Sequence, residues 1–478
     1  MEILKVLALR GPNVWANFPV LEAWVDLGEL ADRRCDQLPG FNDRVMGWLP
    51  TMIDHRCNVG ERGGFFQRLR SGSNLAHAVE HVTLELQTKA GTNAGFGRTC
   101  ETAQWGTYKV VVECEEESVA RACLAEAREL CLAALHDLPY DVAAAVNRLS
   151  ELNQDVRLGP STRAIVGAAE ARGIPARRLS QGSLVQFGFG AKQRRILASE
   201  TDRTGAVAES IAQDKDLTRS LLRSCGIPMP VGRPVISADD AWAAANEIGM
   251  PVVVKPQFGN QGRGVATYLT TREQVVGAYD AALSEGSSIV VERYLPGADY
   301  RLLIVGNRMV AAARREPAQV VGDGRHTVAE LVDLVNADPR RGNDHATPLS
   351  KIRLDPVAMG VLADQGLTPT YVPAAGVKVL VRRNGNLSTG GTATDVTDLV
   401  HPEVAARAVE AARVVGLDVA GVDVIALDIG RPLEEQDGGV VEVNAAPGLR
   451  MHVEPSLGKP RPVGEAIVAS LFPESQVL

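Results

Sequence analysis

Helix-like and strand-like segments alternate along the last two thirds of this chain, and this alternation limits the folds that it can adopt. Residues 158–179 combine a Pro-Ser-Thr helix start, apolar residues at helical spacing and a Gly-Ile-Pro stop. The same order recurs at 214–232 and 236–256, and residues 401–429 again have the pattern of a helix and then a strand. Alternation of this kind predicts an α/β fold.

The chain is also too long for one hydrophobic core. It has 478 residues, of which 45% are hydrophobic and 23% charged, as in a globular protein of several domains. Near the N-terminus, a β-branched run at 108–114 predicts a strand, and residues 117–138 are rich in Ala and Leu, as in a helix. We expect an α/β domain at 1–156 and a second domain at 157–478, with its core at about 215–472.

Composition narrows the classes of function. No run of 18 apolar residues occurs and the N-terminus lacks a signal-peptide pattern, so we expect a cytoplasmic protein without a membrane span. The seven cysteines are scattered and form no C-x-x-C pair, which favours free thiols over disulfides or a zinc ribbon. A net charge of -8 argues against nucleic acid as a partner, although a local basic cleft could still hold an anionic substrate.

A lysine at the end of a β-branched run, followed by a glycine-rich loop, is the first candidate for a phosphate site. The stretch "VVVKPQFGNQGRGV" (252–265) places Lys255 ahead of Gly259, Gly262 and Gly264. The ammonium group and the N–H groups of a flexible loop could together hold a polyphosphate. Taken alone, the loop fits an ordinary hairpin equally well, and it lacks the P-loop sequence G-x-x-x-x-G-K-[ST].

Other charged residues of the second domain fit the same nucleotide. Lys215 stands at a helix start, and a strand at 289–293 leaves through Glu292 and Arg293. The backbone of this exit, as far as Leu295, could recognise a purine, while Asp299 could accept a hydrogen bond from a ribose hydroxyl.

Three oxygen donors predict a magnesium site. Asp423 and Glu442 lie on two segments that we expect to be adjacent strands, and Asn444 points to the same side as Glu442 because side chains alternate along a strand. Carboxylate and carbonyl oxygens shared with phosphates suit Mg²⁺. For each residue taken alone, a solvated or helix-capping side chain is the simpler interpretation.

The combination resembles the ATP-grasp ligases, such as D-alanine ligase and glutathione synthetase. Longer strings are similar to the N-terminal and ATP-grasp parts of cyanophycin synthetases, from residue 1 to about 472; among them are "GGFFQRLRSGSNLAHAVEHVTLELQTKAG", "GSLVQFGFGAKQRRI" and "NLSTGGTATDVTDLVHPE". The resemblance implies an N-terminal α/β domain followed by an ATP-grasp domain whose two lobes clamp the nucleotide. It also implies a homo-oligomer, specifically a tetramer.

The same resemblance implies an activity. With ATP and Mg²⁺, the enzyme would form an acyl phosphate and ADP, and would add L-aspartate to the C-terminus of a cyanophycin-like peptide. Full-length family members continue into a Mur-ligase-like domain that attaches arginine, and we find no second nucleotide loop in this sequence. We therefore expect the aspartate-adding half. Either a separate arginine-adding ligase is its partner, or the chain is a truncated or repurposed member of the family; a non-catalytic subunit of an arginine-adding enzyme is the alternative.

Two further groups of residues would contact the substrate. Arg301 and Arg315 are candidates for binding the acyl phosphate or the acceptor carboxylate, because a guanidinium matches such oxyanions; surface salt bridges are an equal alternative. Ser388, Thr389 and Gly390 would line the acceptor site.

A second constellation lies in the first domain. In "HAVEH", His77 and His81 are four residues apart on one helical face and could bind Zn²⁺, with Glu80 placed to activate a metal-bound water, as in inverzincin peptidases. A structural helix with two histidines is the alternative. Some cyanophycin synthetases use this N-terminal site to cut the polymer into primers. We name Glu116 or Glu117 as the third ligand, with His55 and Cys57 left open.

Overall fold

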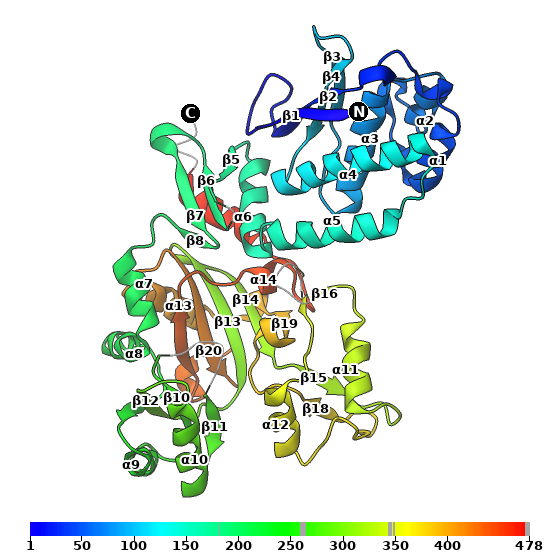
Figure 1. Ribbon diagram of the computed structural model, residues 1–478. Coiled ribbons are helices and arrows are strands. Elements are labelled where there is room, and N and C mark those ends of the chain that lie inside the picture. Colours follow the sequence, from blue (N-terminus) through cyan, green and yellow to red (C-terminus); the bar gives the residue numbers. More distant parts are fainter. Residues whose placement is uncertain (181, 259–263, 343–346, 348, 474–478) are drawn as a thin grey trace. The chain divides into compact units, whose positions relative to one another are not determined.

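The computed structural model describes residues 1–180, 182–258, 264–342, 347 and 349–473 (Figure 1). The chain divides into two compact units, Met1–Arg157 and Leu158–Leu478, and each has its own hydrophobic core.

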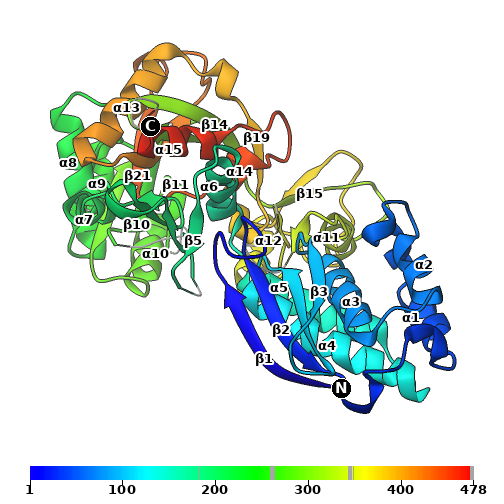
Figure 2. The same ribbon diagram turned by 90° about the horizontal axis from the view of Figure 1, so that it is seen from above.

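The first unit is an antiparallel sheet with helices packed on one face (Figure 2). On the two central strands, alternate residues such as Leu21, Val25 and Val112 are buried against the helices, as the period of two requires. The strand order is β1-β2-β4-β3, with β1 (Glu2–Leu9), β2 (Val20–Asp26), β3 (Gly97–Glu101) and β4 (Thr107–Glu113). The helices are α1 (Phe41–Trp48), α2 (Gly64–Arg70), α3 (Leu75–Lys89), α4 (Glu117–His136) and α5 (Val142–Val156).

The second unit opens with a small antiparallel sheet and the helices beside it. The sheet has the order β5-β6-β7-β8, with β5 (Ala176–Arg178), β6 (Leu184–Phe187), β7 (Arg194–Leu197) and β8 (Glu200–Thr201). Next to it, α6 (Pro160–Ala171) packs against α15 (Val463–Leu471). Two helices then follow along the chain, α7 (Ala206–Gln213) and α8 (Lys215–Ser224).

A four-stranded antiparallel sheet forms the smaller lobe of this unit. Its order is β11-β10-β12-β9, with β9 (Gly232–Val235), β10 (Val252–Pro256), β11 (Ala266–Leu269) and β12 (Ile289–Arg293). Two helices, α9 (Ala238–Ile248) and α10 (Arg272–Leu283), cover the face that carries Val252, Val254 and Val291. Lys255 and Glu292 point to the opposite face, because they alternate with those buried residues.

The larger lobe is built on a five-stranded sheet of order β19-β14-β13-β20-β21. Its apolar face packs against α13 through residues such as Leu302, Val422 and Val424. The strands are β13 (Ala298–Val305), β14 (Arg308–Glu316), β19 (Thr392–Asp395), β20 (Val419–Ala426) and β21 (Gly439–Asn444), with α13 (Pro402–Val415) and α14 (Arg450–Val453) beside them.

An insertion between β14 and β19 has a small core of its own. It contains β15 (Gln319–Val321) paired with β18 (Lys378–Leu380), β16 (Arg341–Gly342) paired with β17 (Leu349–Ser350), and the helices α11 (Val328–Asn336) and α12 (Pro356–Asp364). Within the described ranges, no helix is both long enough and apolar enough to cross a bilayer.

Candidate functional site

A buried three-membered ion pair lies on the uncovered face of the small lobe. Glu292 on β12 is 3% exposed, and its two oxygens lie 2.6 Å from Lys255 Nζ and 2.5 Å from an Arg219 Nη of α8. Gly232 on β9 leaves room for this carboxylate, since a Cβ at that position would lie 2.6 Å from Glu292 Cγ. The Glu292 carboxylate therefore holds the Lys255 ammonium group near the end of β10.

Helix α8 joins the two lobes through side chains one turn apart. Lys215, its first residue, lies 3.3 Å from Glu442 of β21, and Arg219 reaches Glu292 of β12. The helix starts at Lys215 because the Asp214 carboxylate accepts hydrogen bonds from the N–H groups of Asp216 and Leu217. Sequence analysis identified Lys215 as a candidate but missed Arg219. Arg219 could have been found because it lies four residues after Lys215 and therefore on the same side of the helix.

The polar face of the large sheet brings four charged side chains together. Cross-strand pairing sets Arg301 opposite Asp423 and Asp299 opposite Arg315. Arg301 donates to both oxygens of Asp423, and one Nη of Arg315 donates to Asp299 at 2.6 Å and to Asp423 at 2.9 Å. Arg301 and Arg315 are thus inward-facing partners of a carboxylate, in contrast to the surface salt bridges considered as an alternative.

Burial and neighbouring charges shift the pKa values of this cluster in opposite directions. Burial raises the pKa of Asp423, but the guanidinium groups of Arg301 and Arg315 outweigh it and hold that pKa below its ordinary value. For Asp299, burial prevails over Arg315 and the pKa is raised. Burial lowers the pKa of Arg315, yet Asp423 and Asp299 together raise it above its ordinary value.

The three oxygen donors proposed for magnesium lie side by side. The predicted adjacency of their strands is observed, with Asp423 opposite Glu442 and Gly421 opposite Asn444. Asn444 donates its amide N–H to the Gly421 carbonyl at 3.3 Å. A Cβ on Gly421 would lie 2.8 Å from Arg301, so the glycine gives that side chain its path to Asp423. This set of neighbouring oxygens fits a magnesium ion that also binds phosphate.

The remaining predicted residues occupy the edges of these sheets. Gly262 lies outside the described residues, whereas Gly264 has a φ of +65° and packs beside Pro256 and Ala282. Arg293 ends β12 with an exposed side chain, and Leu295 follows it next to Gly439.

The segment expected to line the acceptor site forms a short turn, η6 (Leu387–Thr389), closed by Gly390 at a φ of +94°. Leu387 packs with Ala313 of β14 and Ala393 of β19, which fixes the turn at the sheet edge. Ser388 is exposed, Thr389 donates to the Asn386 carbonyl, and the Gly390 carbonyl accepts from Arg341.

A separate cluster in the first unit could hold a metal ion. Potential ligand atoms of Cys57, His77 and His81 all lie within 4.8 Å of one another, and His77 Nε2 is 3.4 Å from Cys57 Sγ. Burial lowers the pKa of His77 to about 4 and that of His81 to about 2, so both rings are neutral at physiological pH. Two neutral imidazoles and a thiol are a ligand set that suits zinc.

The third member of this cluster is Cys57, not Glu116 or Glu117. Cys57 begins the short turn η4 (Cys57–Val59), where its backbone has a φ of +50°. Glu117 starts α4 and pairs with Arg10 and Arg121. The start of α4 lies at the far end of α3, because Gln87 donates to the Glu113 carbonyl, whereas His77 occupies the first turn of α3.

Glu80 is placed beside these ligands. Its Oε1 lies 3.8 Å from His81 Nε2, and its Oε2 accepts a hydrogen bond from Thr99 at 2.5 Å. Burial raises the Glu80 pKa to about 7, although the Thr99 hydroxyl opposes this shift. Gly97 allows the close approach of β3, since a Cβ there would lie 2.5 Å from Glu80 Oε1. A carboxyl group with this pKa can exchange a proton near neutral pH.

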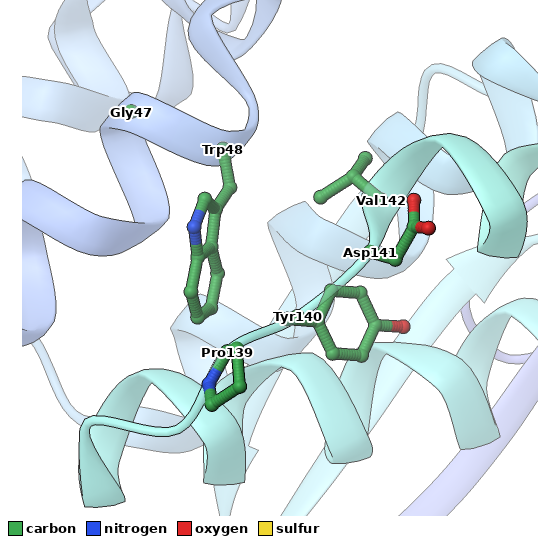
Figure 3. Close-up of a pocket in the computed structure, with 6 residues that line it drawn as sticks. All are labelled: Gly47, Trp48, Pro139, Tyr140, Asp141 and Val142. Atoms are coloured by element: carbon green, nitrogen blue, oxygen red, sulfur yellow. The ribbon is translucent and has the colours of Figure 1, made fainter.

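The first unit also has a surface hollow lined by Gly47, Trp48 and residues 139–142 (Figure 3). The rings of Trp48 and Tyr140 pack with centroids 5.7 Å apart, and the Tyr140 hydroxyl donates to Glu126. The residues that line this hollow include none of the metal-ligating or phosphate-binding candidates, and we assign it no chemistry.

Each of the two units contains a match to a known protein family. Residues 22–136 match the family described as the cyanophycin synthase-like N-terminal domain. Residues 214–347 match the ATP binding domain of the carbamoyl-phosphate synthase L chain.

Individual relatives agree with these families. The chain is 44% identical to the cyanophycin synthetase of Nostoc sp. over 482 residues, which is 100% of this chain and 54% of the relative. It is 43% identical to that of Synechocystis sp., covering 99% and 55%. The glutathione biosynthesis bifunctional protein of Clostridium perfringens is 34% identical over 297 residues, 62% of this chain and 37% of that protein.

Among solved structures, a bifunctional glutathione synthetase from Pasteurella multocida is similar with a TM-score of 0.52 and 29% identity, over 76% of this chain and 52% of that chain. The second unit therefore has the ATP-grasp fold, which implies ATP as its nucleotide. The chain spans about half the length of the curated relatives it matches. It is a cyanophycin synthetase-like protein, and its similarity to those enzymes covers their N-terminal and ATP-grasp domains.

Proposed function

We propose that the protein is an ADP-forming ligase that adds L-aspartate to the C-terminus of a cyanophycin-like peptide. The observation that carries this proposal is the convergence of Lys215, Glu442, Asp423, Arg301 and Arg315 on one sheet face, joined by α8 to the Lys255 cluster. The whole-chain similarity to cyanophycin synthetases supports the choice of substrate.

The chemistry requires a carboxylate to become an electrophile. The acceptor's C-terminal carboxylate takes the γ-phosphoryl group of ATP, which yields an acyl phosphate and ADP. The amino group of aspartate then attacks the acyl carbon, loses a proton and expels phosphate. Such transfers depend on positioning and charge neutralisation more than on a protein nucleophile.

Each residue has a part in this proposal. Lys215 and Lys255 bind the phosphates, while Asp423, Glu442 and Asn444 hold Mg²⁺. Arg301 and Arg315, with their fixed guanidinium groups, stabilise the acyl phosphate. Backbone groups from Arg293 to Leu295 and the Asp299 carboxylate bind the nucleoside, Gly264 contributes to the phosphate site, and the Ser388–Gly390 turn receives the acceptor.

The experiment offers the full chain ATP, Mg²⁺ and a panel of amino acids, with and without a cyanophycin-like primer. We expect ADP only when aspartate and primer are both present, and a product heavier by one aspartyl residue in the mass spectrum. Lys215→Ala should raise the KM for ATP, whereas Arg223→Ala, an exposed position on the same helix, should not. ADP release that does not depend on aspartate would contradict the assignment.

A second activity is favoured by the Cys57, His77 and His81 cluster with Glu80 beside it. We propose a zinc-dependent peptidase that cuts the polymer and so supplies primers, with Glu80 as general base. Incubation of the full chain with cyanophycin and zinc should yield shorter chains, and Glu80→Gln should abolish the cleavage. Cleavage that survives both Glu80→Gln and a strong chelator would rule out this role.

A further inference from the structure

A second row of polar groups adjoins the histidines of α3. His55 Nδ1 lies 2.9 Å from His81 Nδ1, and His55 Nε2 lies 3.1 Å from Glu85 Oε2. Glu85 lies four residues after His81 and therefore on the same face of α3. The row thus runs without interruption from Glu85 through His55 to His81.

The carboxylate at the end of this row determines where the ring protons lie. Glu85 is 4% exposed and accepts from Lys89 Nζ at 3.3 Å and from the Thr51 hydroxyl, so it is an acceptor only. The proton between Glu85 and His55 is therefore on His55 Nε2. When that is the only proton on the His55 ring, its Nδ1 is bare and accepts from His81 Nδ1–H. His81 Nε2 is left with its lone pair available.

The other nitrogen of His81 lies beside Glu80. His81 Nε2 is the ring atom that lies 3.8 Å from Glu80 Oε1. His77 shows the same arrangement, with Nδ1 2.6 Å from Ser73 Oγ and Nε2 3.4 Å from Cys57 Sγ. In both histidines, therefore, Nδ1 is the ring atom that makes the short hydrogen bond to the protein, and Nε2 lies on the other side of the ring.

Stacking restricts rotation of the His81 ring. The Phe65 ring lies against His81 with centroids 4.0 Å apart and an interplanar angle of 23°. The ring of His81 is therefore held between Phe65 and the hydrogen bond to His55.

We propose that His55 and Glu85 are positioning residues that fix the tautomer and orientation of His81 and thereby set the zinc affinity of the site. This inference rests on the proposed metal site. Protein groups that hydrogen-bond to metal-ligating histidines typically contribute 10- to 100-fold to metal affinity.

Zinc affinity of the full chain, measured by competition with a chromophoric chelator, is the first test. His55→Phe keeps a ring but removes both nitrogens, and should weaken zinc binding about 10- to 100-fold. His55→Gln, whose amide oxygen can accept from Nδ1–H, should recover part of that loss. Wild-type affinity in His55→Phe would overturn the proposal.

A matched control variant distinguishes loss of the Glu85–His55–His81 hydrogen bonds from general damage to the domain. Glu22 is also a buried carboxylate, 5% exposed, with a lysine at 3.3 Å, but it accepts from the indoles of Trp15 and Trp24 instead of a histidine. Glu85→Gln should weaken zinc binding, and Glu22→Gln should leave it unchanged. Equal losses of zinc affinity in the two variants would count against a role of Glu85 in positioning His81.

The tautomer can be read without any metal. In the zinc-free full chain labelled with ¹⁵N-histidine, the His81 signal, identified by its absence in His81→Gln, should show the proton on Nδ1. In His55→Phe this preference should be lost. A proton on Nε2 of wild-type His81 would overturn the inference. If zinc does not bind but the Nδ1–H tautomer is present, the proposed metal site is wrong, while His55 still fixes the tautomer of His81.

Discussion

Single residues decide the geometry of the ligase site. Period-two alternation was enough to predict that Glu442 and Asn444 share a sheet face, and the expected adjacency of their strand to that of Asp423 is observed. Spacing could not reveal that Arg219 would contact Glu292, because 73 positions separate them and only the tertiary fold joins them. The sequence likewise left Cys57 as one of several possible ligands. Its contact with His77 of α3 depends on the turn before α2, which spacing along the chain does not reveal.

Gly421→Ala should impair catalysis by displacing Arg301. The new methyl group would lie 2.8 Å from the Arg301 guanidinium and from Pro447. We expect a fall in kcat of about tenfold, measured by ADP release, and a lower melting temperature by scanning calorimetry, because Pro447 must shift as well. Gly277→Ala, in α10 with open space around it, should leave kcat unchanged. Normal turnover in Gly421→Ala would show that Arg301 does not need this path.

Asp395 should contribute stability that depends on pH. It is 7% exposed and paired with Arg461; burial raises its pKa, but Arg461 and Thr397 outweigh this and hold the pKa below the ordinary value. A depressed carboxyl pKa stabilises the fold above about pH 4 and loses that contribution as the pH falls further. Urea unfolding from pH 7 to 3 should therefore show a deficit for Asp395→Asn that shrinks in acid. Asp398→Asn, 61% exposed on the same arginine, should show almost none.

At the scale of elements, α8 links the two lobes, because Lys215 pairs with Glu442 of β21 and Arg219 pairs with Glu292 of β12. The helix start was predictable from Asp214-Lys215, since an aspartate ahead of a helical run is a common cap. Its contacts with β12 and β21 were not, because helical periodicity carries no information on which strands a helix meets.

Removal of the α8 cap should weaken ATP binding. Asp214→Ala should cost about 1 kcal/mol of stability, fray the turn that holds Lys215, and raise the KM for ATP severalfold. Ser237→Ala removes the equivalent cap of α9, where the hydroxyl accepts from the Asp240 N–H. It should cost similar stability without changing the KM. Equal effects of the two variants on the KM would show that α8 has no special role.

At the scale of the molecule, the two units have separate cores and separate candidate sites. The α/β fold class was predictable from the alternation of periods and from the family resemblance, and the comparisons confirm it. The whole-chain similarity to the cyanophycin synthetase of Nostoc sp. spans both units and about half of that relative's length.

The two proposed activities should be separable. Asp423→Asn should abolish ADP formation while leaving zinc-dependent cleavage intact, because Asp423 belongs to the second unit. Glu80→Gln should do the reverse. Both activities are measured on the same samples, by coupled ADP assay and by product mass. A single substitution that removes both would show that the sites do not work independently.

The ion pairs of the ligase site have a consequence for how it is loaded. The two carboxylates assigned to magnesium already have cationic counterions, Asp423 in Arg301 and Arg315, and Glu442 in Lys215. A bare divalent ion would have to displace these without compensation. A metal that arrives with its triphosphate would bring new anions for the released side chains, so loading would be an exchange of counterions in which the nucleotide helps the metal to bind.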